Sequence, residues 1–334
     1  MVAHILEFFF SGKVSITGTG SCLMEFFFML SGFFMMAHID GLNGREEMTW
    51  DFLIRKIKGF FVPLCIMNAI QFVIHCITNN VNTFSGVLKK LIHFGWELLL
   101  LQTAGMIQSP QFNQDYLLGY AWYLSAMMLA LVFAYPLAKH FRKVFVNIVC
   151  PLAVLAIYAV FAQKYGSLNA GNDFTGPFMD AFLRGFAGTC LGVLCYSAYM
   201  YCGNKGGKPT KLMTALDAVC WMALPGIPLL TFFCREDYGL IMLIPVFVIV
   251  LSAMLNKTPV ARFLNRIPAS AAAFMSKLSL YIYLSHYSAM RLAMLLLPEG
   301  KPEAKALAAI AGTAVFSYML YTVDKARGAK RESA

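Results

Sequence analysis

Long apolar runs alternate with short polar segments along almost the whole chain. Nine of these runs are close to the length, about 20 residues, that a helix needs to cross the hydrocarbon core of a bilayer. They cover residues 22–38, 59–77, 117–137, 145–163, 178–200, 212–233, 238–255, 270–296 and 304–323. The pattern predicts an all-α fold, a polytopic transmembrane helix bundle that forms a single integral-membrane domain over residues 1–334.

Two further apolar segments do not fit this pattern. Residues 1–10 would form a helix of about 15 Å, roughly half the thickness of the core. Either the first span is short and begins in mid-membrane, or the sequence lacks the start of its first helix; we favour the truncated helix. Residues 84–105 carry Lys89, Lys90 and Glu97 among apolar residues, which is typical of an amphipathic, interfacial or partly inserted helix. We therefore expect about nine to ten spans and one interfacial helix.

The composition is typical of a membrane protein. The partners that we expect are the lipid bilayer and the substrates. Hydrophobic residues make up 59% of the chain and charged residues 13%, more apolar surface than a soluble domain could bury. The net charge of +10 could suggest a nucleic-acid partner, but the basic residues lie in short loops, so we expect no nucleic acid. The nine cysteines are scattered without metal-ligand spacing, so we expect no metal.

The loops differ in charge in a regular way that predicts the orientation of the chain. Of the 27 lysines and arginines, 17 lie on alternate loops, at residues 39–58, 138–144, 201–211, 256–268 and 324–334. Loops rich in lysine and arginine face the cytoplasm in multi-pass proteins. We therefore expect a protein of the cell membrane whose basic tail and C-terminus are cytoplasmic.

We single out eight ionisable side chains inside the apolar runs or in the first ten residues. They are His4, Glu7, Glu25, Asp180, Arg184, Lys277, His286 and Arg291. Because a charge at membrane depth is costly, such residues usually face a cavity or one another and mark functional sites. Four of them, from four different helices, fall in the outer half of the membrane when counted from the ends of their runs: His4, Glu25, Arg184 and His286. The sequence therefore predicts a buried polar site in that half.

Each of these residues also has a purely structural explanation. His4 could be an ordinary N-terminal residue near the membrane interface. Glu25 could cap its helix, because an acid in the first turn suits the helix dipole. Arg184 could pair with Asp180 one turn earlier, and His286 could bond a backbone carbonyl. The lysine and the arginine of 270–296 lie near opposite ends of the run and could extend to the two membrane surfaces.

Four segments resemble conserved landmarks of one family of membrane enzymes. The run EFFFMLSGFF at 25–34 resembles the hallmark of acyltransferase family 3, and it is the most specific of the four. The runs YAWYLSAMMLA at 120–130, FLRGFAGTCLGVL at 182–194 and KLSLYIYLSH at 277–286 resemble three further landmarks, in the order that the family has them. The resemblance covers nearly the whole chain.

The resemblance implies an activity and a key residue. Members have about ten spans and move an acyl group, often acetyl, from acyl-CoA onto a carbohydrate or glycolipid acceptor at or beyond the membrane. The family's key histidine ends the first helix, and His4 matches it by its distance from 25–34. The basic residue that precedes this histidine by about ten positions has no counterpart here, which is the main departure from the family pattern. The basic segment of the family is only loosely matched by 53–63.

Acyl transfer from a thioester to a hydroxyl needs a base, a group that stabilises the oxyanion, and exclusion of water. We interpret His4 as the general base, because an imidazole titrates near neutral pH, with Glu7 or Glu25 orienting its other nitrogen. Arg184 would hold the oxyanion or an acidic group of the acceptor. His286 would bind the acceptor or act as a second proton-transfer group.

Two further sets of residues complete the predicted site. Trp122 is a candidate substrate contact, although a tryptophan there also suits anchoring at the membrane interface. Arg55, Lys56, Lys58 and Arg142 could hold the phosphates of CoA, although topology alone would also place basic residues there. We expect acyl-CoA as a co-substrate and no tightly bound cofactor.

Two other functions remain open from the sequence. Intramembrane charges also mark the substrate paths of transporters, so the chain could export a lipid-linked sugar. A truncated first helix could also leave a folded but inactive member of the family.

Overall fold

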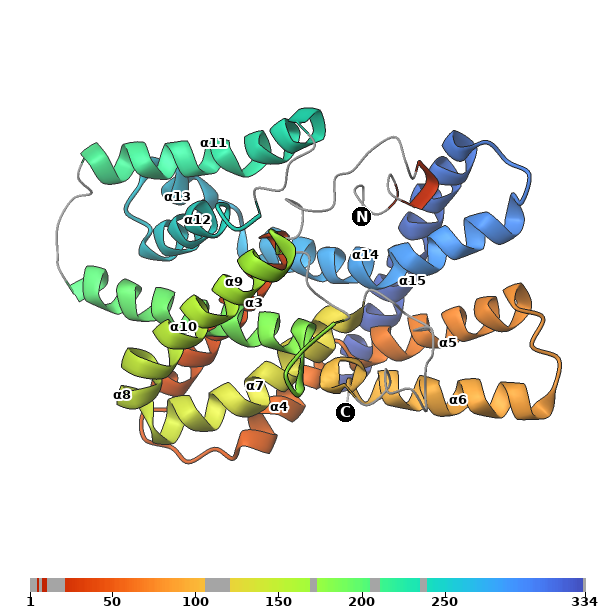
Figure 1. Ribbon diagram of the computed structural model, residues 1–334, viewed down its shortest axis with the longest axis horizontal. Coiled ribbons are helices and arrows are strands. Elements are labelled where there is room, and N and C mark those ends of the chain that lie inside the picture. Colours follow the sequence, from red (N-terminus) through yellow and green to blue (C-terminus); the bar gives the residue numbers. More distant parts are fainter. Residues whose placement is uncertain are drawn as a thin grey trace. The chain divides into compact units, whose positions relative to one another are not determined.

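The computed structural model describes residues 5, 8–10, 22–105, 121–168, 173–204, 211–234 and 239–332. Helices dominate this part of the chain (Figure 1), and its only strands are β1 (Phe174–Thr175) and β2 (Phe178–Met179). The all-α prediction is thus confirmed. The chain divides into two compact units, one of Met1–Val14, Ile54–Trp122 and Pro268–Ala334, the other of Ser15–Leu53 and Tyr123–Ile267. We call them the first and the second unit and describe each by itself.

The first unit contains two helical hairpins. Its elements are α5 (Phe61–Thr78), α6 (Phe84–Leu98), the 3-10 turn η1 (Gln102–Ala104), α14 (Ala269–Leu296) and α15 (Pro302–Glu332). Thr83 caps α6 by accepting a hydrogen bond from the backbone N–H of Gly86 at 3.3 Å, as a threonine at this position often does. Helix α5 packs against both α6 and α14, and α14 packs along α15. Helix α4 (Thr49–Lys58) has residues in both units.

The second unit is a bundle around α10. Its elements are α3 (Cys22–Gly41), α7 (Trp122–His140), α8 (Arg142–Val144), the π-helical η3 (Phe145–Val149), α9 (Cys150–Tyr165), α10 (Asp180–Asn204), α11 (Lys211–Cys234), α12 (Leu243–Leu255) and α13 (Pro259–Leu264). Helices α3, α9 and α12 pack against α10, and α3 and α9 cross it in Figure 1. The antiparallel strands β1 and β2 turn at Gly176, whose φ of +61° suits glycine.

Every predicted run overlaps a helix, but fewer helices have the length and hydropathy of a span. Among the described residues six qualify: Cys22–Gly41, Phe61–Thr78, Trp122–His140, Arg142–Tyr165, Asp180–Gly203 and Pro302–Gly328. Shorter apolar stretches lie in α11 and α12, at Met213–Ala223 and Leu243–Leu255. The predicted interfacial segment forms α6 and η1. The count of nine to ten spans and the interfacial position of 84–105 therefore stay predictions.

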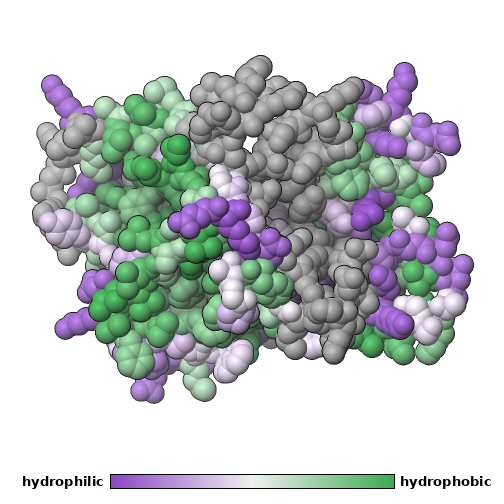
Figure 2. All heavy atoms as spheres, viewed as in Figure 1, coloured by the Kyte–Doolittle hydropathy of each residue, from purple (hydrophilic) through white to green (hydrophobic). Residues whose placement is uncertain are grey.

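Apolar side chains cover much of the second unit on the face seen in Figure 2. Helix α9 shows why, because Leu152 and Leu155 are more than half exposed. Exposed leucines on a helix of membrane length are typical of a surface in contact with lipid.

Glycines bring α3 and α10 together at backbone distance. A Cβ added at Gly32 would lie 2.0 Å from the carbonyl oxygen of Thr189, and one at Gly192 would lie 2.0 Å from that of Met29. Helix α7 approaches at Gly185, where a Cβ would lie 2.9 Å from the carbonyl oxygen of Ala126. Small residues at membrane helix interfaces allow such close approach. The packing fixes the position of α3 relative to α10, and with it the site described next.

Candidate active site

A buried ion pair joins α3 and α10 inside the second unit. The Nε atom of Arg184 donates to Oε1 of Glu25 at 2.5 Å, and the two side chains are 2% and 0% exposed. The hydroxyl of Tyr158, on α9, donates to the other carboxylate oxygen of Glu25 at 2.7 Å. Three helices thus hold one carboxylate, with both of its oxygens bonded.

The sequence provides the space for this carboxylate through a glycine. Gly188 lies one turn after Arg184 on α10, and a Cβ there would lie 2.8 Å from Oε2 of Glu25 and 2.6 Å from the Cβ of Phe28. The glycines of 182–194 therefore have distinct tasks. Gly188 makes room for the carboxylate, Gly192 lets α3 approach, and Arg184 supplies the opposite charge that a buried carboxylate needs.

The alternative that Arg184 pairs with Asp180 is wrong. Asp180 instead accepts a bond from Nζ of Lys164 at 2.9 Å, and the hydroxyl of Tyr165 also donates to it. The N–H of Asp180 in turn donates to the carbonyl oxygen of Asp173 at 2.8 Å. This second polar cluster lies where α9 ends and α10 begins. Glu25 does lie in the first turn of α3, as its capping alternative requires, but its carboxylate bonds Arg184 and Tyr158.

A third polar cluster contains Arg142, one of the cations predicted to hold CoA. Two guanidinium nitrogens of Arg142 donate to the two carboxylate oxygens of Asp40, one of them at 3.1 Å. The hydroxyl of Tyr196 also donates to Asp40, at 2.7 Å. The charge of Arg142 is thus balanced within the second unit, which weakens the case for it as a phosphate ligand.

Glu47 is the centre of a hydrogen-bond network in the segment that follows α3. Nε2 of His38 donates to Oε2 of Glu47 at 2.6 Å, and the hydroxyl of Tyr135 donates to the same oxygen at 2.7 Å. Nζ of Lys139 donates to the backbone carbonyl of Glu47 at 2.5 Å, and the ring of Tyr135 stacks on Phe52 at a centroid distance of 4.4 Å. These contacts fix the segment that connects α3 to α4.

In the first unit, His286 is buried on α14 and bonded to its own helix. Its Nδ1 lies 2.6 Å from the carbonyl oxygen of Tyr283. Because a carbonyl can only accept, Nδ1 carries a proton, and in the neutral ring the lone pair is then on Nε2. The backbone bond matches the structural alternative for His286, and the tautomer that it sets is also the one that an acid–base role at Nε2 needs.

The other two charges of 270–296 have partners in the first unit. Lys277 donates to Asp324 of α15 at 2.6 Å, and Arg291 donates to the hydroxyl of Tyr287 at 3.0 Å and 3.2 Å. These bonds hold both charges close to α14 and α15. The sequence had instead favoured extension of both side chains to the membrane surfaces.

Of the remaining predicted residues, His4 and Glu7 lie outside the described residues. Ile5, which lies between them in the sequence, packs with Met290 and Ala293 of α14. Trp122 is half-buried at the start of α7.

The three cations predicted to hold CoA besides Arg142, namely Arg55, Lys56 and Lys58, lie close together along α4. Burial, and next the charge of Arg55, lower the pKa of Lys56 below its usual value. Within the described ranges, no three His, Cys, Asp or Glu side chains could hold a metal ion.

A model of the acyltransferase domain matches residues 1–322. The chain belongs to acyltransferase family 3. It is therefore a membrane acyltransferase, and its apolar helices make it a multi-pass one. No curated protein and no solved structure matches the chain.

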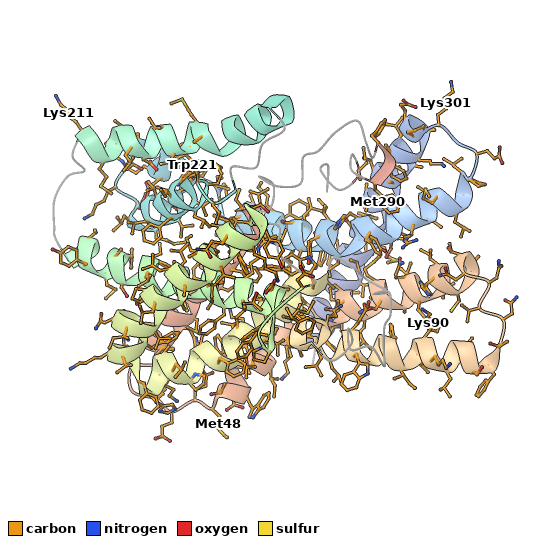
Figure 3. All side chains as sticks on the ribbon, in the orientation of Figure 1. Met48, Lys90, Lys211, Trp221, Met290 and Lys301 are labelled. Atoms are coloured by element: carbon orange, nitrogen blue, oxygen red, sulfur yellow. The ribbon has the colours of Figure 1, made fainter. Side chains whose placement is uncertain are left out.

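Two features of this acyltransferase were missed by the sequence analysis. Asp217 lies within the apolar run 212–233 and is buried on α11, one turn before Trp221 (Figure 3). The criterion that selected the other eight ionisable residues would have found it. His38 and Glu47 lie at the end of an apolar run and in a loop, where a histidine and a glutamate are ordinary, so no pattern pointed to their bond.

Proposed function

We propose that the protein is an O-acyltransferase that moves an acyl group, acetyl in the first instance, from cytoplasmic acyl-CoA to a hydroxyl of a cell-envelope carbohydrate or related acceptor. The family match over residues 1–322 carries the proposal. The buried pair of Glu25 and Arg184 supports it, because two segments that resemble family landmarks supply the two charges.

The proposed chemistry uses His4 as the general base. A nitrogen of His4 takes the proton of the acceptor hydroxyl, whose oxygen attacks the thioester carbon. The tetrahedral intermediate then collapses, the C–S bond breaks, and the CoA thiolate leaves and takes up the proton. An oxygen ester and free CoA are the products.

The bonding of Glu25 bears on the other proposed roles. Both of its oxygens are engaged by Arg184 and Tyr158, so Glu25 is better suited to fixing the guanidinium than to orienting His4. Of the two carboxylates considered for orienting His4, this favours Glu7. Arg184, fixed in this way, is a preorganised charge that could stabilise an oxyanion.

For the donor, the cations of α4 are the first candidates, because three of them lie close together on one helix. Arg55, Lys56 and Lys58 form a run of like charge that would attract a polyanion. The pKa of Lys56 is lowered by burial and by Arg55, and phosphates nearby would relieve that repulsion. We propose that these three side chains hold the phosphates of acyl-CoA.

The test is acyl transfer in membranes that contain the full chain. Radiolabelled acetyl-CoA is incubated with envelope polysaccharide, and label in the polysaccharide is counted. The His4→Ala variant should lose about 10²–10⁴-fold of the rate, the usual contribution of a positioned base. His140→Ala, at an exposed end of α7, is the matched control and should keep it.

Transfer that survives in His4→Ala within a factor of ten would remove His4 from the base role. A wild-type chain that moves solute without consuming the thioester would be a transporter, and one that does neither would be an inactive family member.

A further inference from the structure

Helix α5 carries a polar stripe in the middle of its buried face. The buried residues of α5 repeat every three to four positions and define a single face. Asn68, Gln71 and His75 lie on that face among apolar neighbours such as Leu64 and Met67. Because α5 packs against α14 and α6, the stripe points into the first unit.

Two amides of this stripe are buried and carry polar atoms that have no hydrogen-bond partner among the described residues. Asn68 is 0% and Gln71 1% exposed. Within the described part of the chain, neither the oxygen nor the nitrogen of the Asn68 amide has a partner, and the amide oxygen of Gln71 has none either. Buried polar groups in native proteins are nearly always bonded, so each exception calls for an explanation, such as a bound molecule.

A hydroxyl on α14 shows the same property. Ser288 is 0% exposed, and its Oγ has no hydrogen-bond partner among the described residues. Helix geometry places it relative to the neighbours of α14. Ser285 and Ala289 face α15, through Ser317 and Gly312, whereas Met290, marked in Figure 3, faces the cluster of Ile5.

Ser288 and Leu284 share the remaining buried side of α14. At about 100° per residue, Ser288 lies about 60° from Ser285 and about 160° from Met290, so this side flanks the contact with α15 and is opposite the contact with Ile5. Helix α5 also packs on α14, so this side is the one available to it. We infer that Ser288 faces the polar stripe of α5.

These groups point to a class of ligand. They present two acceptor oxygens, one amide nitrogen donor and one hydroxyl, spread over two helices, and α5 has no Lys, Arg, Asp or Glu. Phosphates would need cations, and an acyl chain would leave these polar atoms without hydrogen bonds. A sugar ring meets the requirement, because each hydroxyl both donates and accepts.

We propose that Asn68, Gln71 and Ser288 bind the hydroxyl groups of the carbohydrate acceptor inside the first unit. The proposal rests on the proposed function and assigns its acceptor site. The amides are specificity-determining residues, and they keep their hydrogen-bonding groups unbonded until the acceptor arrives. A site that awaits a polar ligand should be less stable when empty than an apolar site of the same shape.

The test uses Asn68→Leu and Gln71→Met in the full chain. Each variant should raise the KM for envelope polysaccharide at least tenfold and leave the KM for acetyl-CoA within twofold. Each should also keep or raise the Tm of the detergent-solubilised protein, because an unbonded amide is removed from the interior. Asn147→Leu, an exposed asparagine of η3, is the matched control and should leave both KM values unchanged.

A second readout separates this site from the reaction. Fluorescently labelled fragments of the polysaccharide should bind the solubilised wild-type chain and lose at least tenfold in affinity in Asn68→Leu. Binding without transfer in the wild type would refute the proposed function and keep this site. Transfer in the wild type, with an unchanged acceptor KM in both variants, would refute this site and keep the function.

Two further outcomes also overturn the site. A raised KM for acetyl-CoA would assign the stripe to the donor, whose pantetheine amides and adenine can also bond amide side chains. A lowered Tm would show that the amides are structural.

Discussion

Glu25 and Arg184 lie 159 positions apart in the sequence and 2.5 Å apart in the second unit. Each is nearly without solvent exposure, so neither charge is stable there without the other. The hydroxyl of Tyr158 and the space above Gly188 complete the arrangement. At the scale of the residue, the molecule thus holds a guanidinium at a fixed position among apolar helices, which is the arrangement that the role proposed for Arg184 at the oxyanion would use.

Separating stability from activity tests this pair. Arg184→Met alone should destabilise the protein by about 3–5 kcal/mol, because it leaves a buried carboxylate without its partner. The double variant Glu25→Leu with Arg184→Met should recover most of that stability and remain inactive. Lys277→Met, which breaks an exposed pair with Asp324, is the control and should cost at most about 1 kcal/mol.

Thermal unfolding in detergent and the acyl-transfer assay give the two readouts. Activity in the double variant would show that the pair has only a structural role. A single variant as stable as the wild type would show that Glu25 is not charged in the folded protein.

The sequence identified both members of this pair but not their pairing. An ionisable residue in an apolar run is visible because it is costly there, and this selected Glu25 and Arg184. The nearest opposite charge along the helix, Asp180, was the obvious partner of Arg184, yet it bonds Lys164. Helical spacing gives only neighbours on the same helix, and the choice between them depends on which helices pack together.

At the scale of the element, α3 and α10 are held by backbone contact. The glycines Gly32 and Gly192 face carbonyl groups across the interface at distances that exclude any side chain. The apolar runs predicted the helices themselves, since about 20 apolar residues specify a helix in a membrane. They did not predict the ends so well. Within the run 238–255, helix α12 begins at Leu243, and the run that begins at 178 starts with β2, two residues before α10.

Gly192→Ala tests the close contact of α3 and α10. The added methyl would overlap the carbonyl of Met29, and overpacking of this kind costs about 1–3 kcal/mol or more. We expect a lower Tm and a larger loss of acyl transfer, because α3 carries Glu25. Gly203→Ala, on the same helix with nothing within 4 Å of the added Cβ, should keep both. Equal effects of the two substitutions would contradict the role of the interface.

At the scale of the whole molecule, the chain is a multi-pass acyltransferase whose orientation is proposed from its loop charges. Lysines and arginines gather on alternate loops, and the four cations of the basic tail lie in the last part of α15, which ends at Glu332. Loop charge governs orientation during insertion. The packing of the helices does not distinguish the cytoplasmic side of the bilayer from the opposite side. For this reason the helices could be read from the sequence and compared with the structure, whereas the cytoplasmic side stays a prediction.

Reporter fusions after residue 334 test the orientation. A green fluorescent protein there should fluoresce and an alkaline phosphatase should be inactive, because the first folds in the cytoplasm and the second beyond the membrane. The same reporters after residue 167, in a loop predicted on the opposite side, should give the reverse pattern. Identical results at both positions would overturn the alternation.

The glycine contacts between α3 and α10 also limit how this enzyme can move. Two helices whose main chains touch cannot slide or tilt past one another without a clash at Gly32 or Gly192. The guanidinium of Arg184 and the carboxylate of Glu25 should therefore move as one rigid body during catalysis. We expect the movements that admit substrates and release products in other helices, while α3 and α10 stay fixed to each other.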